Sequence, residues 1–257
     1  MIDTALRGID VSSYQGRIDW RAVREDGIRF AMIKATQGRA LSDPDLRNFT
    51  DSRFADNVRG ASAAGIVCGA YHYLTAQNEA EAEAEADVFL SAVTPYRTKL
   101  MLGAAVDVED SCLPRDKTSL TAVVRAFCRR VKQFGMDIMV YTNPDFLRHR
   151  LNSLGEFGLW LALWRNKENP PSTERYPNLR IWQWGTESVS GITGKADANF
   201  GMAGLLSQAV PVTDYAAEVK RLAGLADVTV EYLSMYRYGD DLLRKLYYAM
   251  VKEDDKG

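Results

Sequence analysis

Short apolar runs recur along this chain and end in polar or aromatic residues. They cover residues 6–12, 30–34, 67–73, 102–106, 138–141, 159–164 and 180–184. Near-continuous apolar runs are typical of strands buried on both faces, as in a parallel sheet. The runs therefore predict a series of strands whose far ends carry the reactive side chains.

Stretches with helical spacing separate these runs. Leu120, Val123, Val124 and Phe127 recur at the intervals of an amphipathic helix. Residues 79–87 alternate Glu with Ala, but both are strong helix formers, so we expect a solvated helix start there. Strands that alternate with helices predict the α/β class and a single (β/α) barrel, an irregular TIM-like barrel of about eight strands. In such a barrel the polar residues at the carboxyl ends of the strands converge on one site.

The triplet Asp107-Val108-Glu109 directly follows the apolar run at 102–106. Side chains two residues apart on a strand point to the same face, about 6.6 Å apart along it. A general acid beside a second carboxylate is the arrangement that cleavage of a glycosidic bond needs. The alternative is that both acids only end a strand in solvent.

Eight short blocks together carry a resemblance to a known family. They are Gly8-Ile9-Asp10-Val11-Ser12-Ser13-Tyr14-Gln15-Gly16, Lys34-Ala35-Thr36-Gln37-Gly38, Gly69-Ala70-Tyr71-His72-Tyr73, Asp107-Val108-Glu109, Tyr141-Thr142-Asn143, Trp160-Leu161-Ala162, Trp182-Gln183-Trp184 and Asp197-Ala198-Asn199. In content and order they resemble glycoside hydrolase family 25, the lysozymes of bacteriophages of Gram-positive hosts, of bacteria and of some fungi. The resemblance covers about residues 5–205.

The resemblance implies a role for each of four carboxylates. Glu109 is expected to be the general acid, and Asp10, Asp107 and Asp197 to surround the scissile bond. We expect a neighbouring anion at Asp107 to raise the proton affinity of Glu109, while Asp107 itself stays ionised and stabilises developing positive charge. The nucleophile is either a carboxylate or the acetamido oxygen of the substrate itself, and the sequence leaves this open.

Aromatic residues near the predicted strand ends are candidates for sugar binding. We expect Tyr71 and Tyr141 to contact substrate, with Tyr73 and Trp184 as further candidates, because flat rings match the C–H faces of pyranoses. Gln37 is also expected to bind substrate; it stands where the family usually has Glu, so it keeps a hydrogen-bonding side chain without the charge. Trp160 and Trp182 lie within their runs and are expected to fill the core.

Composition excludes several functional classes. A net charge of -2 gives no electrostatic footprint for nucleic acid, and no apolar run reaches the length of a membrane span. The first residues lack the pattern of a signal peptide, which predicts a protein held in a host bacterial cytoplasm that acts on the wall after release, as a phage endolysin does. A bacterial enzyme released by lysis would look the same.

Cysteine and histidine usage predicts neither disulfides nor a metal site. Cys68, Cys112 and Cys128 are odd in number, and His72 and His149 have no metal-ligand spacing. We expect His72 to hold a hydrogen bond in the barrel wall and His149 to lie on the surface. No cofactor is expected.

The chain changes character after residue 200. Residues 1–207 are predicted to form the catalytic barrel, and residues 208–257 a short C-terminal α-helical segment with six of the twelve tyrosines. So short a segment cannot bury a robust core of its own. We expect it either to bind the cell wall or to mediate self-association.

The leading interpretation is a muramidase that cleaves the β-1,4 bond between N-acetylmuramic acid and N-acetylglucosamine in peptidoglycan. A chitinase-like hydrolase of acetamido sugars is one alternative, although it expects a further Asp where Ala105 stands. A non-catalytic wall-binding barrel is the other. Retention of all four carboxylates favours the enzyme.

Overall fold

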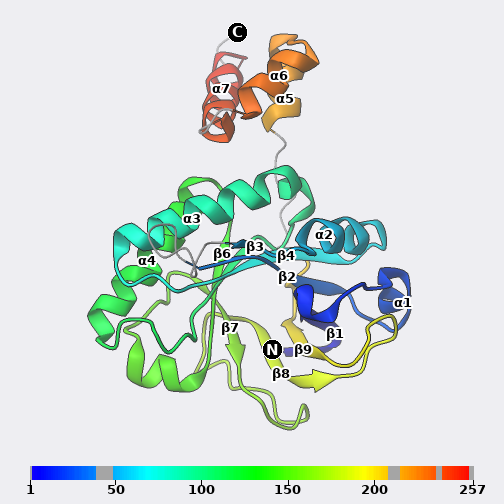
Figure 1. Cartoon of the computed structure of the whole chain (residues 1–257), viewed down its shortest axis with the longest axis vertical. Helices are drawn as coiled ribbons and strands as arrows, with labels where there is room; N and C mark the ends of the chain where they lie inside the picture. The colour runs from blue at the N-terminus through cyan, green and yellow to red at the C-terminus, as the bar shows by residue number, and fades with distance from the viewer. Residues whose placement is uncertain (1, 39–48, 208–214, 236–238, 255–257) are drawn as a thin grey trace. The chain divides into compact units, whose positions relative to one another are not determined.

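A computed structural model describes residues 2–38, 49–207, 215–235 and 239–254 (Figure 1). The chain divides into two compact units, Met1–Val210 and Pro211–Gly257. Each unit is described by itself.

The first unit is a closed barrel. Nine strands form one sheet in the order β1-β9-β8-β7-β6-β5-β4-β2-β3, and a parallel pairing of β1 with β2 closes it. The two-residue β3 (Phe49–Thr50) only extends the edge of β2, which leaves eight strands in the barrel. They are β1 (Ile2–Val11), β2 (Phe30–Gln37), β4 (Val67–Tyr73), β5 (Ala104–Asp107), β6 (Ile138–Thr142), β7 (Gly158–Ala162), β8 (Leu179–Glu187) and β9 (Ala196–Met202). The predicted single barrel is confirmed.

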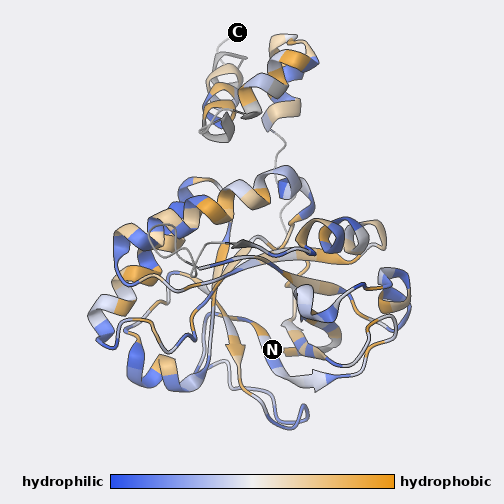
Figure 2. Cartoon of the chain, viewed as in Figure 1, coloured by the Kyte–Doolittle hydropathy of each residue, from blue (hydrophilic) through white to orange (hydrophobic). Residues whose placement is uncertain are grey.

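Helices α1 (Trp20–Glu25), α2 (Phe54–Ala63), α3 (Glu79–Val93) and α4 (Lys117–Gln133) lie around the outside of the sheet (Figure 1). Short helical turns, η1 (Ser13–Gln15), η2 (Thr94–Lys99) and η3 (Phe146–Arg150), complete the connections. Helix α4 begins where the carboxylate of Asp116 accepts a hydrogen bond from the backbone N–H of Ser119 at 2.8 Å. Figure 2 shows both orange and blue along α3 and α4, as expected of helices with one buried face.

The expectation of parallel strands that alternate with helices fails in the last third of the barrel. Strand β9 is antiparallel to both β8 and β1. Residues 163–178 and 188–195, which make the two connections around β8, are all described and contain no helix. For the connection from β8 to β9 the physical reason is that antiparallel neighbours can be joined by a short loop. Strands β7 and β8 are parallel, and residues 163–178 cross between them without a helix. The reversal places the first residues of β9 at the rim where the parallel strands end.

Two layers of apolar side chains position this rim. Inside the barrel, Phe30, Met32, Met139, Trp160 and Ile181 pack together. Outside it, a larger cluster joins the other faces of the strands to the helices. Interior packing is tight, since a Cβ added at Gly8 would approach the ring of Phe30 to 2.3 Å. The strands are thus fixed on both faces, and their ends are held firmly.

The second unit consists of α5 (Tyr215–Ala223), α6 (Asp227–Met235) and α7 (Gly239–Asp254). Val219 and Leu243 are buried in it. The rings of Tyr215, Tyr247 and Tyr248 lie 5.3–5.9 Å apart. Two of the six tyrosines of this segment, Tyr236 and Tyr238, fall outside the described residues. No helix in the described ranges is both long and apolar enough to cross a membrane.

Candidate functional site

Four carboxylates meet at the carboxyl-terminal rim of the barrel. Asp10 lies at the end of β1 and Asp107 at the end of β5, with Glu109 two residues further on. Asp197 lies at the start of β9 and pairs in register with Asp10. Asp197 reaches the rim from the start of its strand because β9 runs in the opposite direction to the parallel strands.

Asp10 is buried and held by two amides. Its Oδ2 accepts hydrogen bonds from Nε2 of Gln183 at 3.0 Å and from Nδ2 of Asn199 at 2.8 Å. Burial, then the negative charge of Asp197, raises the pKa of Asp10 to about 7, and the two amide hydrogen bonds oppose this rise. Asp10 can therefore exchange a proton near neutral pH.

Indole and phenol donors fix the orientation of these amides. Nε1 of Trp160 donates to Oδ1 of Asn199 at 2.8 Å. Oε1 of Gln183 accepts from the hydroxyl of Tyr141 at 3.0 Å and from Nε1 of Trp164 at 2.9 Å. Because an indole N–H can only donate, each amide must direct its oxygen to the indole and its NH₂ group to Asp10.

Sequence reasoning missed Gln183, Asn199 and Trp164 as site residues. A signal was present for Asn199, because it lies two residues after Asp197 on a strand and so faces the same side. Gln183 stood inside one of the quoted blocks but carries no charge to draw attention.

Asp107 is the least satisfied of the four acids. Its side chain is buried, and its Oδ1 has no hydrogen-bond partner among the described residues. Burial, and after it the charge of Glu109, raises the pKa of Asp107 well above its usual value, while Lys34 opposes the rise. A buried oxygen without a donor is rare in a folded protein and is found at sites that bind ligands.

The side chain of Glu109 is exposed, but the backbone that precedes it is held by hydrogen bonds. The preceding Val108 is fully buried; its N–H donates to the carbonyl of Tyr141 at 2.9 Å, and its carbonyl accepts from Oγ1 of Thr142 at 2.7 Å. Partial desolvation, then the charges of Asp197 and Asp110, raises the pKa of Glu109.

Glu109 and Asp107 also interact, and the charge of Glu109 raises the pKa of the more deeply buried Asp107. Of two interacting acids, the more deeply buried takes up the proton first, and its charge is then absent for its neighbour.

Lys34 supplies the positive charge of the rim. Its Nζ donates to Oε1 of Gln37 at 2.5 Å. The two side chains share a face although they are three residues apart, because β2 is irregular between Lys34 and Thr36 and the intervening Ala35 and Thr36 both lie buried. Burial lowers the pKa of Lys34, and Asp107 and Asp51 oppose this.

Of the tyrosines expected to bind sugar, Tyr141 and Tyr71 pack against Trp160, and Tyr73 lies beside Lys34. Tyr141 is buried, and its ring meets that of Trp160 edge to face with centroids 4.6 Å apart. The ring of Tyr71 also meets that of Trp160 edge to face, with centroids 5.9 Å apart. Burial and the nearby carboxylates raise the pKa of both phenols, so both remain hydrogen-bond donors at neutral pH. The ring of Tyr73 lies 5.1 Å from Nζ of Lys34.

Trp184 is not brought to the carboxylates. Its ring stacks on Phe200 with centroids 6.0 Å apart and an interplanar angle of 18°. Phe200 directly follows Asn199, which faces the interior, so Phe200 and Trp184 lie on the outer face of the sheet. The same alternation holds on β8, where Gln183 faces the interior toward Asp10 and its neighbour Trp184 therefore faces outward.

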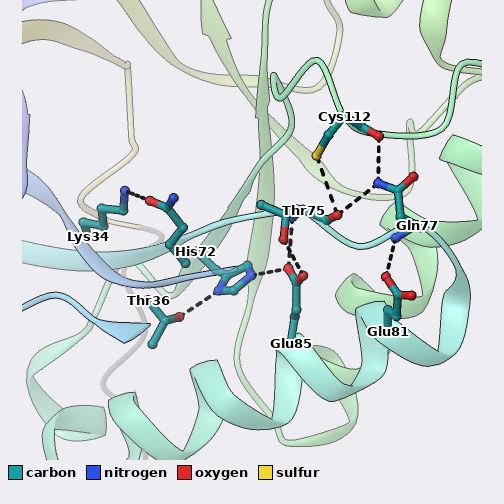
Figure 3. Close-up of polar contacts among 9 residues, drawn as sticks. Lys34, Thr36, His72, Thr75, Gln77, Glu81, Glu85 and Cys112 are labelled. Carbon is teal, nitrogen blue, oxygen red and sulfur yellow. Dashed lines mark hydrogen bonds and ion pairs between the residues drawn. The ribbon is translucent and has the colours of Figure 1, made fainter. Parts of the chain in front are cut away.

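A second buried polar cluster lies on the outer side of β4 (Figure 3). The Nε2 atom of His72 is 2.7 Å from Oε2 of Glu85, and its Nδ1 is 2.7 Å from Oγ1 of Thr36. Glu85 also accepts from the backbone and hydroxyl of Thr75. Burial lowers the pKa of His72, which remains neutral.

The predicted helix start at residues 79–87 is therefore not wholly solvated, because Glu85 on α3 is fully buried against the barrel. In the described part of the chain, no three His, Cys, Asp or Glu residues are placed to hold a metal ion.

The barrel unit of the chain resembles known proteins. Residues 9–192 match the family model for glycosyl hydrolases family 25. The chain is 32% identical over 210 residues to the autolytic lysozyme of Clostridium acetobutylicum, covering 81% of this chain and 60% of that protein. It is 30% identical over 208 residues to lysozyme M1 of Streptomyces globisporus, covering 76% and 67% of the two chains. The chain thus spans less than two thirds of the clostridial relative.

Solved structures agree. The bacterial lysozyme from Streptomyces coelicolor superposes with a TM-score of 0.66 at 29% identity, covering 80% of this chain and 98% of that one. The CTP1L endolysin has a TM-score of 0.67 at 24% identity, covering 79% and 68%, which shows a shared fold.

Proposed function

The chain belongs to glycosyl hydrolases family 25, and we propose that it is an N-acetylmuramidase, cleaving the β-1,4 bond between N-acetylmuramic acid and N-acetylglucosamine in peptidoglycan. The names of its relatives support this substrate: two are lysozymes, and a third, from Arthroderma benhamiae, is an N,O-diacetylmuramidase. The observation that carries the proposal is the meeting of four carboxylates with raised pKa at one rim of the barrel.

Glu109 is proposed as the general acid. Its raised pKa favours the protonated form of the carboxyl group, and its exposed position lets it reach the leaving oxygen of a bound glycan. Asp197 contributes by raising that pKa. When the bond breaks, the proton passes from Glu109 to the leaving oxygen.

Asp107 is proposed to act on the acetamido group of the substrate. Its unpartnered Oδ1 suits a hydrogen bond from the acetamido N–H. That donor, together with positive charge developing on the sugar, favours the ionised form of Asp107 in the complex. The acetamido oxygen then bonds to the anomeric carbon as the leaving oxygen departs, and water, deprotonated by Glu109, later opens the cyclic intermediate.

Asp10 and its two amides are proposed to shape the other side of the site. Because Gln183 and Asn199 hold one oxygen of Asp10, the carboxyl group is fixed before substrate arrives. A fixed polar group loses little entropy on binding and positions the sugar for attack.

The test is clearance of purified Gram-positive walls by wild type and Glu109→Gln. We expect at least about a hundredfold loss of activity in the variant, because an amide cannot donate the proton. The control is Glu168→Gln, which changes an exposed glutamate in the loop after β7. If Glu109→Gln kept more than a few per cent of activity at an unchanged melting temperature, Glu109 would not be the acid.

The two alternatives make different predictions. A chitinase-like enzyme would release sugar from chitin oligomers, but the position two residues before Asp107 is the fully buried Ala105, so a third acid is missing there. A non-catalytic wall-binding barrel would bind walls without clearing them. Crowded, partly unsatisfied carboxylates oppose folding and have no use in a simple binder.

We also propose an endolysin-type setting for the enzyme, with synthesis in a host bacterial cytoplasm and action on the wall after release. The likeness to the CTP1L endolysin supports the fold that such a role needs. The test is expression in a Gram-positive cell. Lysis should follow only when the membrane is permeabilised, and lysis without permeabilisation would contradict the proposal.

The segment 208–257 is proposed to bind the wall. Tyr232 is 77% exposed and Tyr248 50% exposed on its helices, which leaves aromatic surface for a glycan. Self-association through the same surface is the competing outcome, and sedimentation of the whole chain distinguishes the two, because only self-association raises its mass.

A further inference from the structure

Trp164 lies on the interior side of the barrel mouth. Residues 160, 162 and 164 alternate along one strand, and the first of them, Trp160, faces the interior, where it contacts Tyr141. Strand pairing continues past the end of β7, because the N–H of Leu163 donates to the carbonyl of Gln183 at 3.0 Å and that of Arg165 to Trp184 at 3.1 Å. The hydrogen bond from Nε1 of Trp164 to Gln183, whose Nε2 donates to Asp10, places Trp164 on the same side as the carboxylates.

The ring of Trp164 is exposed, while its indole N–H is held by a hydrogen bond. The residue is 61% exposed, yet its Nε1 donates at 2.9 Å to Gln183, which is 2% exposed. Water satisfies the N–H of a typical surface tryptophan, and the ring then changes rotamer freely. Here the hydrogen bond fixes the edge and leaves a face of the ring in solvent.

We propose that Trp164 is a substrate-binding platform that packs against a pyranose ring of the glycan and, through Gln183, holds Asp10 in position. This rests on the proposed function. The chemistry that fits is an N-acetylated sugar, whose apolar C–H face packs on an aromatic ring. The ring thus serves specificity, and Gln183 acts as a positioning residue.

The link to Asp10 is direct. Oε1 of Gln183 accepts from Trp164 and Tyr141, and Nε2 of the same amide donates to Asp10. Loss of the indole donor leaves one donor to orient the amide. A sugar that packs on the ring would therefore stiffen the support of Asp10, and this couples binding to the arrangement of the acids.

Two variants separate the ring from its N–H. Trp164→Phe keeps an aromatic face and loses the donor, whereas Trp164→Ala loses both. Trp20→Phe, on α1 outside the barrel, is the control for tryptophan replacement. Each is measured for kcat, KM and the pH dependence of kcat/KM on soluble glycan fragments released from peptidoglycan. Binding of the same fragments is measured by calorimetry in a Glu109→Gln background.

We expect Trp164→Ala to weaken binding and raise KM about tenfold, since it removes the platform. Trp164→Phe should keep KM within about threefold but lower kcat about tenfold, because Asp10 is less well held. It should also move the limb of the pH profile that reports Asp10 to higher pH, since the Gln183 hydrogen bond lowers that pKa. A purely structural role would not move this limb.

Equal KM effects in the two variants, or no effect of Trp164→Ala on binding, would overturn the platform. An unchanged pH profile and kcat in Trp164→Phe would overturn the link to Asp10. If the wild type failed to cleave any wall fragment, the proposed function would fail, and the calorimetric comparison would still decide whether Trp164 binds the glycan.

Discussion

Two buried carboxylates, Glu85 and Asp107, lie on opposite faces of the same barrel wall and differ in their hydrogen bonding. Glu85 is fully buried on the outer side and accepts hydrogen bonds from His72 and from both donors of Thr75 (Figure 3). Asp107, inside the rim, has a buried oxygen with no donor in the described part of the chain. Its pKa is raised well above the usual value.

The difference separates scaffold from site. A buried acid with all its hydrogen bonds made stabilises one arrangement of the strands, and its removal leaves its donors unpaired. A buried acid that lacks donors and faces other acids opposes folding, and it is retained where function needs it. Burial alone therefore does not identify a structural carboxylate; the number of donors around it does.

Asp107→Asn should give the largest effect. The amide cannot carry the negative charge, so we expect activity to fall by about 10²–10³-fold. Stability should rise, because repulsion with Glu109 and Asp10 is relieved; a gain of about 1 kcal/mol would raise the melting temperature by about 2–4 °C. Wall clearance and calorimetry on the same sample measure both. A variant that is inactive and less stable would make Asp107 a structural acid like Glu85.

Glu85→Ala should show the reverse. It leaves the His72 and Thr75 donors unpaired in the core, which should cost about 3 kcal/mol of unfolding free energy in urea titration. The folded fraction should clear walls at a rate near that of wild type. Glu83→Ala on the exposed side of the same helix is the control and should change stability little. Loss of activity without loss of stability would place Glu85 in the chemistry.

The sequence could predict the acids but not their surroundings. Asp107 and Glu109 follow an apolar run, so their place at a strand end could be inferred from pattern alone. The reversal of β9 could not, since Ala196–Met202 has no feature that sets its direction, and Asp197 reached the rim for a reason the pattern did not contain. The repeated Glu and Ala of residues 79–87 gave no sign that Glu85 would be buried.

The other features that the sequence could not predict depend on hydrogen bonding. The amides around Asp10 are uncharged, and what matters in them is which atom faces which neighbour. That orientation depends on Trp160 and Trp164, which are distant from them in sequence and adjacent only once β7, β8 and β9 pair.

The pH dependence of stability sharpens the contrast further. Asp10 has a folded-state pKa of about 7 against a usual 3.8, so the folded state holds a proton that the unfolded state releases. Its contribution is therefore fully present below about pH 4 and is lost as the pH rises to about 7, by about 4 kcal/mol, since each pKa unit corresponds to about 1.4 kcal/mol. The lowered pKa of His72 acts in the opposite sense as the pH falls, so the measurement is the difference from Asp10→Asn. A wild-type minus variant difference that did not change between pH 5 and 8 would contradict the raised pKa.

The smallest effect on chemistry should come from removal of residues 208–257. The four acids lie in the first unit, so a chain of residues 1–207 should cleave soluble fragments at the full rate. Activity on whole walls should fall, because a wall-binding segment raises the effective concentration of enzyme at an insoluble substrate. An insoluble or inactive truncation would show that the helices complete the barrel instead.

The most direct test of the account is mass analysis of the reducing ends released from purified walls by wild type and by Glu109→Gln. The account predicts fragments ending in N-acetylmuramic acid from the wild type and none above background from the variant. Fragments ending in N-acetylglucosamine, or equal release by the two proteins, would contradict it.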